Sequence, residues 1–354
     1  MPVSSPAPSR KIAVVDGKIE ISVKGEWITV PAIDFGGNAI IARGKWIGIA
    51  QVQDEQWLET ELEDPQGCIE KLKERESRGL HANIFTFSQK PSSTTPKYSY
   101  MMEQESIAAI HLVSFKDWWE KLPQETRKNV RRSQKRGVVI EVRNFDADLI
   151  KGISDVNNDS PIRQRERNIY YGRTLDQVKK DYSSFVDRSD FICAYVEKEM
   201  IGFLKLVYRR DVASILNFTP KGSHSDKRPG NALIAKAVEL CEAKGISYVT
   251  YGKYNYGNKG DSPLREFKIR NGFEEILVPR FYVPLTNWGR VCLALKLHRG
   301  LLGLLPHRLI TIAVQARERW YDFKQSRSRC SSMSERPNCD RQMGRSNPPA
   351  GSNI

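Results

Sequence analysis

The sequence lacks the features that mark secreted, disulfide-bonded and membrane-spanning proteins. Its six cysteines are scattered, with no Cys-x-x-Cys pair and no His–Cys cluster, which argues against a disulfide framework and a zinc site. Residues 1–10 are rich in Pro and Ser but have no apolar core of a signal peptide. No run of about 18 apolar residues is available to cross a bilayer. We therefore expect a cytoplasmic protein of enzyme size that holds no metal.

Positive charge is concentrated in two stretches of an otherwise nearly balanced chain. The 354 residues carry a formal net charge of +14, and 40 % of them are apolar, which is enough for two modest cores or one composite core. Residues 116–136 hold 8 basic and 3 acidic residues, and residues 286–354 hold 12 basic and 4 acidic. Two such surfaces can attract phosphates, RNA or an anionic membrane. Solvated helix faces and a solubilising tail are the simpler explanation for either stretch alone.

Residues 11–114 have the pattern of a compact α+β half. Alternating apolar residues and turn residues predict strands at 11–15, 19–23, 27–30, 81–88 and 106–113. A helix is predicted at 64–77, because Asp64 can cap it, Pro65 suits its first position and Gly79 follows its end. We identify no nucleophile, metal or phosphate pattern in this half.

Residues 115–145 predict two helical segments and a strand. One side of the first segment is apolar, with Phe115, Trp118, Trp119 and Leu122. The second segment is basic, with Arg127, Lys128, Arg131, Arg132, Lys135 and Arg136. Gly137 then ends the helix before a β-branched strand at 138–142. The basic face is either a solvated surface or a contact for a polyanion.

Residues 191–285 give the clearest order of elements. Strands are predicted at 192–196, 201–208, 212–218, 246–251 and 275–285, and the first three are joined by short charged turns. Between the third and fourth strands, a helix is predicted at 229–244, with an apolar stripe wide enough to lie on a sheet and with Gly245 at its end. A short helix from about Asp261 leads to Asn271-Gly272 and the last strand.

The segment 224–232 stands directly before the long predicted helix. The first N–H groups of a helix have no partner within it, and Lys227 and Arg228 lie beside them in a stretch where Gly230 has no side chain. This pattern predicts a site for an anion such as a pyrophosphate. A basic loop before a helix that starts at Pro229 is also a common helix cap.

The order of elements and one closing motif resemble a known superfamily. Residues 191–285 look like the GNAT acyl-CoA N-acyltransferase fold, whose C-terminal element Tyr/Phe-x-x-x-Gly-Phe is similar, with one extra residue before the Gly, to Leu264-x-x-Phe267-Lys268-x-x-Asn271-Gly272-Phe273. With residues 116–142 and the strand-rich first half, residues 11–285 resemble the double-GNAT arrangement of Fem-type aminoacyltransferases and their FemAB-like relatives. The resemblance implies an α+β fold of tandem GNAT-like halves, with mixed, mostly antiparallel sheets flanked by helices.

The resemblance also implies a division of the chain. We expect a disordered N-terminus at 1–10, a first GNAT-like half at 11–114, a second acyltransferase domain at 115–285, a basic amphipathic helical extension at 286–324 and a disordered basic tail at 325–354. In the extension we predict two helices, 288–305 and 307–324, separated at Pro306. They either dock on the domain or lie in a membrane interface.

A GNAT-type donor site follows from the resemblance. In GNAT proteins the loop before the long helix binds pyrophosphate through backbone amides, and the matching positions here are Lys227, Arg228, Gly230, Asn231 and Ala232. The usual Arg/Gln-x-x-Gly-x-Gly/Ala pattern is incomplete, because only Arg228, Gly230 and Ala232 approximate it. The implied donor is an acyl-CoA. Fem-type enzymes use aminoacyl-tRNA and commonly carry a long helical hairpin, and the sequence has no long heptad insertion at 145–275, which disfavours tRNA.

Acyl transfer needs an unprotonated amine, a polarised carbonyl and an acid for the leaving group. Tyr251 and Tyr254 lie on or just after a predicted strand, where GNAT folds often place that acid. His224 and Asp226 are candidates for a base or an orienting residue. Tyrosines at strand ends are also common packing residues.

The acceptor is predicted to bind at an unusual basic loop, residues 161–173. It holds four arginines and two adjacent tyrosines, and arginine suits bidentate contacts with carboxylates or phosphates. We single out Arg163, Arg165 and Tyr171 there, together with Lys268 from the short helix. The acceptor is expected to be an amine, either small or part of an envelope or polysaccharide precursor. The rival hypothesis is a GNAT-like module without catalysis, whose basic helices contact RNA or an anionic membrane.

Overall fold

A computed structural model describes residues 14–300, except residues 24, 45, 58–60, 76–78, 164–165 and 256–261. The chain divides into two compact units, Met1–His298 and Arg299–Ile354. Almost all of the described residues belong to the first unit, and the predictions for residues 1–10, 307–324 and 325–354 lie outside the described residues.

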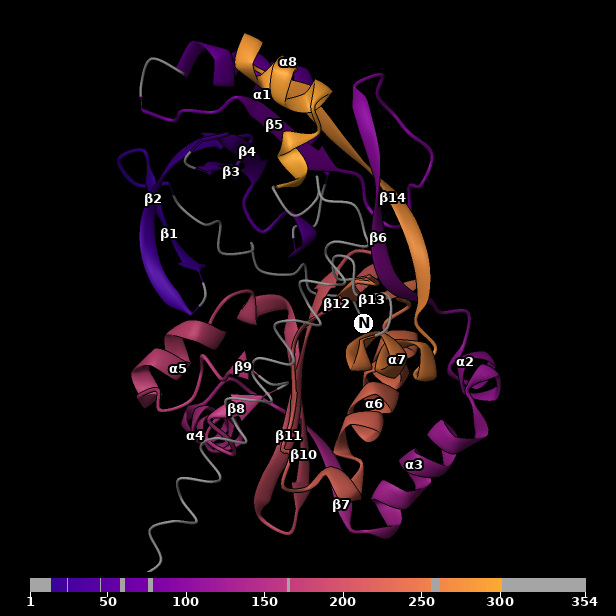
Figure 1. Ribbon diagram of the computed structural model, residues 1–354. Helices are drawn as coiled ribbons and strands as arrows, with labels where there is room; N and C mark the ends of the chain where they lie inside the picture. Colours follow the sequence, from indigo (N-terminus) through magenta and orange to yellow (C-terminus); the bar gives the residue numbers. More distant parts are fainter. Residues whose placement is uncertain are drawn as a thin grey trace, which may run out of the picture. The chain divides into compact units, whose positions relative to one another are not determined.

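One twelve-stranded mixed sheet organises the first unit (Figure 1). Its spatial order is β1-β2-β3-β4-β5-β14-β6-β13-β12-β11-β10-β7, and most neighbouring pairs are antiparallel. The strands are β1 (Lys18–Val23), β2 (Glu26–Phe35), β3 (Asn38–Arg43), β4 (Ile49–Val52), β5 (Ile84–Ser88), β6 (Met101–His111), β7 (Val138–Arg143), β10 (Ser189–Val196), β11 (Glu199–Arg209), β12 (Val212–Pro220), β13 (Tyr248–Lys253) and β14 (Glu274–Pro284). A separate small sheet pairs β8 (Ile162–Arg163) with β9 (Glu166–Arg167).

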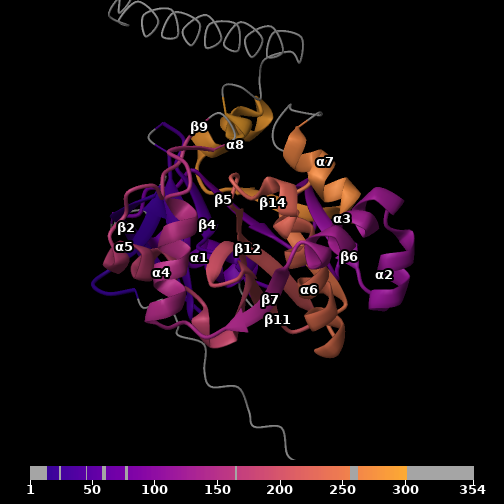
Figure 2. The same ribbon diagram turned by 90° about the horizontal axis from the view of Figure 1, so that it is seen from below.

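Helices cover both faces of the sheet around β10–β12 (Figure 2). The helices of the described residues are α1 (Pro65–Arg75), α2 (Phe115–Lys121), α3 (Gln124–Lys135), α4 (Ala147–Asn157), α5 (Leu175–Tyr182), α6 (Pro229–Ala243), α7 (Pro263–Arg270) and α8 (Asn287–Ala294), with the 3-10 turns η1 (Glu55–Trp57), η3 (Val186–Arg188), η4 (Ser225–Lys227) and η5 (Leu297–Arg299). One hydrophobic core packs α2, α3 and α6 on one face, and another packs α4 and α5 on the opposite face. Residues 191–194 of β10 alternate between the two cores, so both faces of this strand are buried. This explains its continuous run of apolar residues.

Two long strands link the first and second parts of the sheet. β14, the last strand in sequence, pairs with β5 on one side and with β6 on the other, and β6 also pairs with β13. Residues 274–284 of β14 thus lie beside residues 84–88 of β5 and 101–109 of β6. The boundary between residues 114 and 115 stays a prediction.

The strands β12 and β13 part soon after they pair. They form a parallel ladder over three residue pairs, Val212↔Tyr248 to Ser214↔Thr250, although β12 continues to Pro220 and β13 to Lys253. Helix α6 connects the two strands and begins close to the far end of β12. This arrangement places a helix start beside the gap between two diverging parallel strands.

The structure confirms an α+β fold with a mixed, mostly antiparallel sheet flanked by helices. Residues 189–284 follow the predicted order of strands, helix, strand, short helix and final strand. The predicted turns at Gly17 and Gly25 have positive φ angles of 70° and 82°, and the Asp64 carboxylate accepts a hydrogen bond from the Gly67 N–H at 2.8 Å as a helix cap. The sequence prediction missed β3, β4 and α4.

The predicted helix at 288–305 is wrong in its length. Helix α8 ends at Ala294, and Lys296 has a left-handed φ of 57°, which ends the helical hydrogen-bond pattern before η5. Within its described part the extension docks on the sheet, because Cys292 and Leu293 are buried with Ile84 of β5. No helix among the described residues is long and apolar enough to cross a membrane.

Candidate functional site

Helix α6 begins without a side-chain cap. Arg228 occupies the N-cap position with a left-handed φ of 56° and ψ of 41°, and Pro229 follows at the first helical position. The N–H groups of Gly230, Asn231 and Ala232 head the helix, where an α-helix has no internal partners for them. The structure thus places all five predicted donor-binding residues at one helix start, as the sequence predicted.

Gly230 is needed at this start for close packing. A Cβ atom on Gly230 would lie 3.1 Å from Cζ of Phe218 on β12 and 3.7 to 3.8 Å from the ring of Phe267 on α7. The two rings are 5.3 Å apart, centroid to centroid. These rings pack against one side of the helix start, and the chain enters the helix from the side of Lys227 and Arg228.

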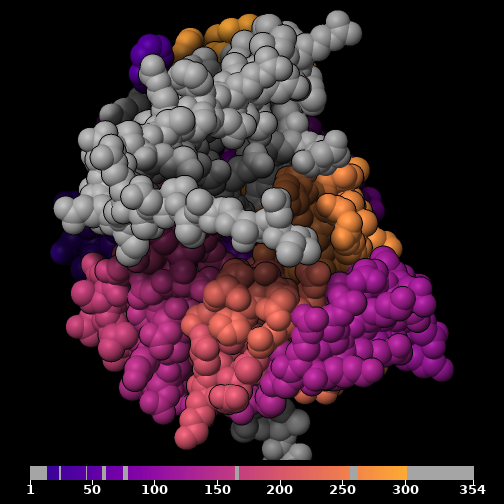
Figure 3. Space-filling model, turned by 60° about the horizontal axis from the view of Figure 1, so that its bottom comes forward, coloured from indigo at the N-terminus to yellow at the C-terminus, as the bar shows by residue number. Residues whose placement is uncertain are grey.

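The approach from that side is basic and exposed. Arg228 is exposed and Lys227 is half-buried. The end of α3 lies alongside, because Arg136 donates to the backbone carbonyl of Asp226 and its Nη1 is 3.5 Å from the Asp226 carboxylate. Figure 3 shows the segment before α6 at the surface beside α3. Asp226 is thus an ion-pair partner of the cations around the helix start, with Lys227 Nζ at 3.7 Å.

Tyr251 of β13 and Lys268 of α7 contact each other next to Phe218 of β12. The Tyr251 ring packs against Phe218 with 5.8 Å between ring centroids, and the Lys268 Nζ lies 4.6 Å from the Tyr251 centroid. Lys268 is fully buried and donates to the Lys253 carbonyl at 2.6 Å. Burial lowers the pKa of Lys268 to about 8. The structure therefore brings Tyr251, Lys268 and the start of α6 together through Phe218 and Phe267.

Tyr254 and His224 lie in other surroundings. Tyr254 is only 9 % exposed, belongs to the core and packs its ring against the Arg265 guanidinium at 5.2 Å. The His224 ring contacts Ser223 through Nδ1 at 3.1 Å and lies 3.6 Å from Glu199 through Nε2. The neighbours of these two side chains are thus different from those of Tyr251.

Two arginines of the predicted acceptor loop make structural contacts. Arg163 donates to the Pro220 carbonyl at 3.1 Å, and burial lowers its pKa. Arg173 donates to the Gly25 carbonyl and lies 3.4 Å from the Asp181 carboxylate. Tyr171 is 48 % exposed, and Arg165 lies outside the described residues.

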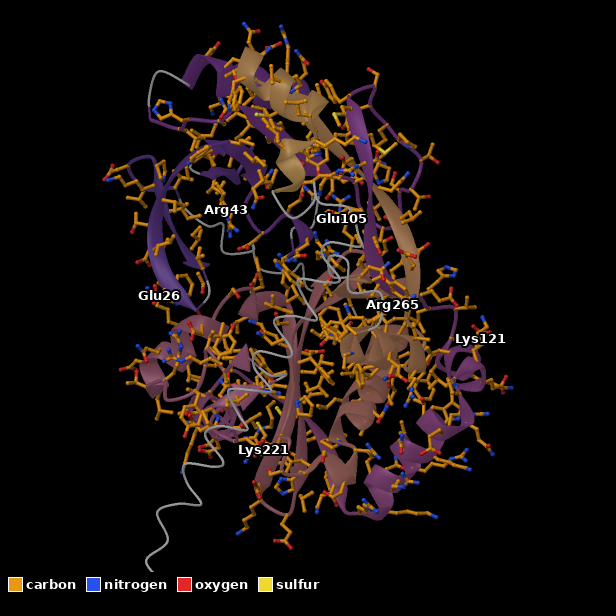
Figure 4. All side chains as sticks on the ribbon, in the orientation of Figure 1. Glu26, Arg43, Glu105, Lys121, Lys221 and Arg265 are labelled. Carbon is orange, nitrogen blue, oxygen red and sulfur yellow. The ribbon has the colours of Figure 1, made fainter. Side chains whose placement is uncertain are left out.

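A charged cavity that the sequence did not reveal lies at the middle of the sheet. Its wide part, about 620 Å³, is lined from β3, β4, β6, β13 and β14, and Arg43 and Glu105 of its lining are labelled in Figure 4. Its narrow part, about 60 Å³, shares Glu55, Glu105, Lys253 and Arg280 with the wide part. Ser214 and Thr250, the last pair before β12 and β13 diverge, line the narrow part. The cavity therefore reaches the vertex of the gap.

Arg280 joins two carboxylates in the cavity wall. Its Nη2 is 2.9 Å from Glu55 Oε2 and its Nε is 2.8 Å from Glu105 Oε2, while Lys253 Nζ lies 3.5 Å from Glu105 Oε1. Burial alone would raise the pKa of Glu105, but the charges of Arg280 and Lys253 hold it below its ordinary value. Burial would lower the pKa of Arg280, and the two carboxylates raise it instead. No group of three or more His, Cys, Asp or Glu side chains in the described ranges is placed to hold a metal ion.

These cavity residues come from elements that are far apart in sequence. Glu55 and Arg280 are separated by 225 positions, and neither lies in a motif. The one local signal is charge on alternate residues, Glu103 and Glu105, which lie on β6 but before the strand predicted at 106–113. That signal gives no partner, so the cavity could not be assembled from the sequence.

Several solved structures are similar to this chain in outline. FemX aligns with a TM-score of 0.49 and 9 % identity over 74 % of this chain and 87 % of that one. The C-terminal domain of a putative lysylphosphatidylglycerol synthetase from Agrobacterium fabrum aligns with a TM-score of 0.49 and 14 % identity over 78 % and 87 %. A tandem GNAT protein from the clavulanic acid biosynthesis pathway aligns with a TM-score of 0.40 and 11 % identity over 73 % and 82 %. No protein-family model and no curated protein matches the chain.

Proposed function

We propose that this protein is an acyltransferase that moves an acyl or aminoacyl group from an activated donor to an amine. The observation that carries the proposal is the divergence of β12 and β13 after three residue pairs, beside the uncapped start of α6. Diverging strands leave main-chain N–H and C=O groups that an extended donor can pair with, as a peptide pairs with an open sheet edge. The helix start supplies donors for a phosphate at the end of the same gap.

The donor in this proposal is an acyl-CoA. Its pyrophosphate binds the N–H groups of Gly230, Asn231 and Ala232 from the exposed side, where Lys227 and Arg228 add positive charge. Because the rings of Phe218 and Phe267 pack on Gly230, the rest of the donor extends past Phe218 toward Tyr251. The thioester then lies near the vertex of the gap.

The reaction at that vertex is an addition to the thioester carbonyl. The amine nitrogen forms a bond to the carbonyl carbon, the carbon–sulfur bond breaks, the amine loses a proton and the leaving thiolate takes one up. Tyr251 is the proposed proton donor to the thiolate, since it follows Thr250, the last residue of β13 that pairs with β12, and its ring packs against Phe218 of β12. Lys268 lies against the Tyr251 ring, and its positive charge would stabilise the negative charge that develops on the thioester oxygen and on the leaving thiolate.

Donor binding is tested by thermal unfolding of the full chain with acetyl-CoA and with a longer acyl-CoA. A donor at 100 times its Kd raises the free energy of unfolding by about 2.7 kcal/mol. A variant with both Lys227→Ala and Arg228→Ala should need more donor for the same shift, whereas Lys151→Ala, an exposed lysine on α4, should behave as wild type. If neither acyl-CoA shifts the unfolding temperature, the CoA-donor proposal is wrong.

A second candidate function is binding of a polyanion by α3. Lys128, Arg131 and Lys135 are exposed and are spaced so that they form one stripe on this helix. The stripe leads to Arg136 and so to the basic side of the α6 start. In this proposal RNA or an anionic membrane binds the stripe. RNA binding that weakens steeply with salt, with a smaller salt slope after Lys128→Ala and Lys135→Ala, would support it.

A further inference from the structure

Buried cations crowd the narrow part of the cavity. Arg209, at the end of β11, is 4 % exposed and lines this part together with Lys90. Burial lowers the pKa of Lys90 to about 7, with further lowering by the charges of Arg209 and Arg188. Burial likewise lowers the pKa of Arg209 to about 10, and Arg188 adds to this effect. Three cations thus repel one another in a region where water screens them poorly.

The carboxylates near Lys90 are bonded to other groups. Glu55 is already bonded to Arg280 and to the Ser88 N–H, and Glu61 is bonded to Lys97 at 2.7 Å. Lys90 itself donates to a backbone carbonyl, that of Glu55, at 2.7 Å. The acidic groups that face Lys90 are therefore engaged by other cations.

The guanidinium of Arg209 can donate more hydrogen bonds than it makes within the described residues. Its Nη2 donates to the Ser214 hydroxyl at 2.9 Å, and this hydroxyl lies 2.6 Å from the Thr250 hydroxyl. Its Nε is buried and has no hydrogen-bond partner among the described residues. Buried polar atoms are rarely left without a partner, so a donor of this kind at a cavity wall indicates a missing acceptor. The guanidinium geometry suits an oxyanion.

We propose that the narrow part of the cavity binds the oxyanion of a small-molecule ligand, a carboxylate or a phosphate group, between Arg209 and Lys90. Its volume of about 60 Å³ corresponds to a few water-sized atoms, since one water needs about 10–15 Å³. One carboxylate or phosphate group fills such a space. In this proposal the rest of the ligand extends toward the wide part, about 620 Å³, which shares Glu55, Glu105, Lys253 and Arg280 with the narrow part.

The wide part is lined by charges of both signs. Four carboxylates, those of Asp54, Glu55, Glu103 and Glu105, line it together with Arg43, Lys253, Arg280 and His298. Glu55, Glu103 and Glu105 each lie within 3.5 Å of one of these cations. The lining therefore selects neither sign of charge for the rest of the ligand, and only the oxyanion is assigned. That this ligand is the acyl acceptor rests on the proposed function, whereas the oxyanion site does not.

The oxyanion site is tested without any acyl donor, so its failure and that of the acyltransferase proposal are distinguishable. Inorganic phosphate and acetate are titrated separately into the full chain at pH 6.5, with sodium chloride keeping the ionic strength constant. Calorimetry should show saturable binding of at least one anion. Binding of phosphate alone indicates a phosphate ligand, and binding of acetate alone indicates a carboxylate. Binding of neither overturns the proposal.

Two variants locate the site. Lys90→Met keeps the length of the side chain and removes its charge, and it should weaken anion binding about tenfold or more, as expected for the loss of a charged hydrogen bond. Lys205→Met is the matched control, because Lys205 is also a buried lysine whose pKa burial lowers to about 7, but its Nζ donates to the Tyr182 carbonyl at 2.7 Å and it lines neither part of the cavity. Equal affinity in wild type and Lys90→Met would overturn the proposal, as would an equal loss in both variants.

A measurement on the wild-type chain covers the case in which Lys90→Met does not fold. Acetic anhydride labels unprotonated amines, so Lys90 should react at pH 7 because of its lowered pKa. A bound oxyanion holds the proton on Lys90 and covers it. Peptide mass spectrometry should then show less labelling of Lys90 with saturating anion and unchanged labelling of exposed Lys151. Unchanged labelling of Lys90 would contradict the site.

Discussion

Replacing Arg280 by methionine should destabilise the protein strongly at neutral pH. Arg280 is bonded to Glu55 at 2.9 Å and to Glu105 at 2.8 Å, and its side chain is 21 % exposed, against 13 % and 17 % for those of the two glutamates. Methionine fills a similar volume but leaves both carboxylates in the cavity wall without this partner. Lys253, at 3.5 Å from Glu105, is then the remaining cation of the network.

The size of the effect follows from the charges and their burial. A pair of unit charges about 3 Å apart interacts with about 5–6 kcal/mol at an effective dielectric constant of about 20. The cost of desolvating the charges offsets most of that attraction, and removal of one partner from a buried pair costs about 3–5 kcal/mol. We expect Arg280→Met to lose about that much, which lowers the unfolding temperature by about 10 °C in a protein of this size.

The loss should shrink as the pH falls. In the wild type, Arg280 keeps the pKa of Glu105 below its ordinary value, so this carboxylate contributes stability above its unfolded pKa and loses it as pH falls through its folded pKa. Without Arg280, burial is the largest remaining cause and raises the pKa of Glu105. The variant therefore gains stability between pH 7 and pH 5, where the wild type changes little.

Urea unfolding of the full chain at pH 7 and pH 5 measures both effects. Arg270→Met is the matched control, because Arg270 pairs with Glu266 at the surface with exposures of 62 % and 60 %, and exposed pairs contribute about 0–1 kcal/mol. Adding Glu105→Gln to Arg280→Met should recover part of the loss, since it removes one of the two unpaired charges. The reasoning is refuted if Arg280→Met costs no more than Arg270→Met.

Three further outcomes are expected. Burial lowers the pKa of Lys205 to about 7 in the folded protein, so between pH 7 and pH 10.5 the unfolded chain binds one more proton and the stability of the wild type rises with pH. Lys205→Met should flatten this rise. Urea midpoints at pH 7 and pH 9.5 measure it. Gly272→Ala should lower the free energy of unfolding by about 2–5 kcal/mol, since the φ of Gly272 is 80° and a Cβ there would lie 2.8 Å from Nε1 of Trp118. Gly245→Ala is the control: its φ is 66° but a Cβ would meet open space, so it should cost about 1–2 kcal/mol in the same assay. Phosphate or acetate affinity should fall as pH rises through the lowered pKa of Lys90, and the Lys90→Met variant should lack this dependence, by calorimetry from pH 6 to pH 8.

Local sequence signals predicted those elements whose limits are set by single residues. Pro65 and Pro229 start helices because their rings fix φ and they need no donor there. Gly137 and Gly245 end helices with φ angles of 76° and 66°, which other residues adopt only with strain. The sequence does not predict the length of α8, because Lys296 adopts a left-handed φ that its residue type does not favour.

The candidate donor site was predictable for the same reason and the cavity was not. The start of α6 and the basic residues before it lie within nine consecutive residues, 224–232, so a single segment of the sequence contains all of the groups in question. The cavity depends on the register of β14 with β5, where Arg280 pairs with Ser88, and of β14 with β6, where Arg280 pairs with Glu103. A shift of this register by one residue would turn Arg280 to the other face of the sheet.

The position of β14 therefore ties the two halves of the proposed chemistry together. Its Arg280 completes the cavity wall, while the connection that precedes it carries Lys268 and Phe267 to the start of α6. Residues 263–284 therefore contribute both to the surroundings of Tyr251 and to the cavity wall. Lys268 donates to the carbonyl of Lys253, and Lys253 lines the cavity, so this hydrogen bond joins α7 to the cavity wall.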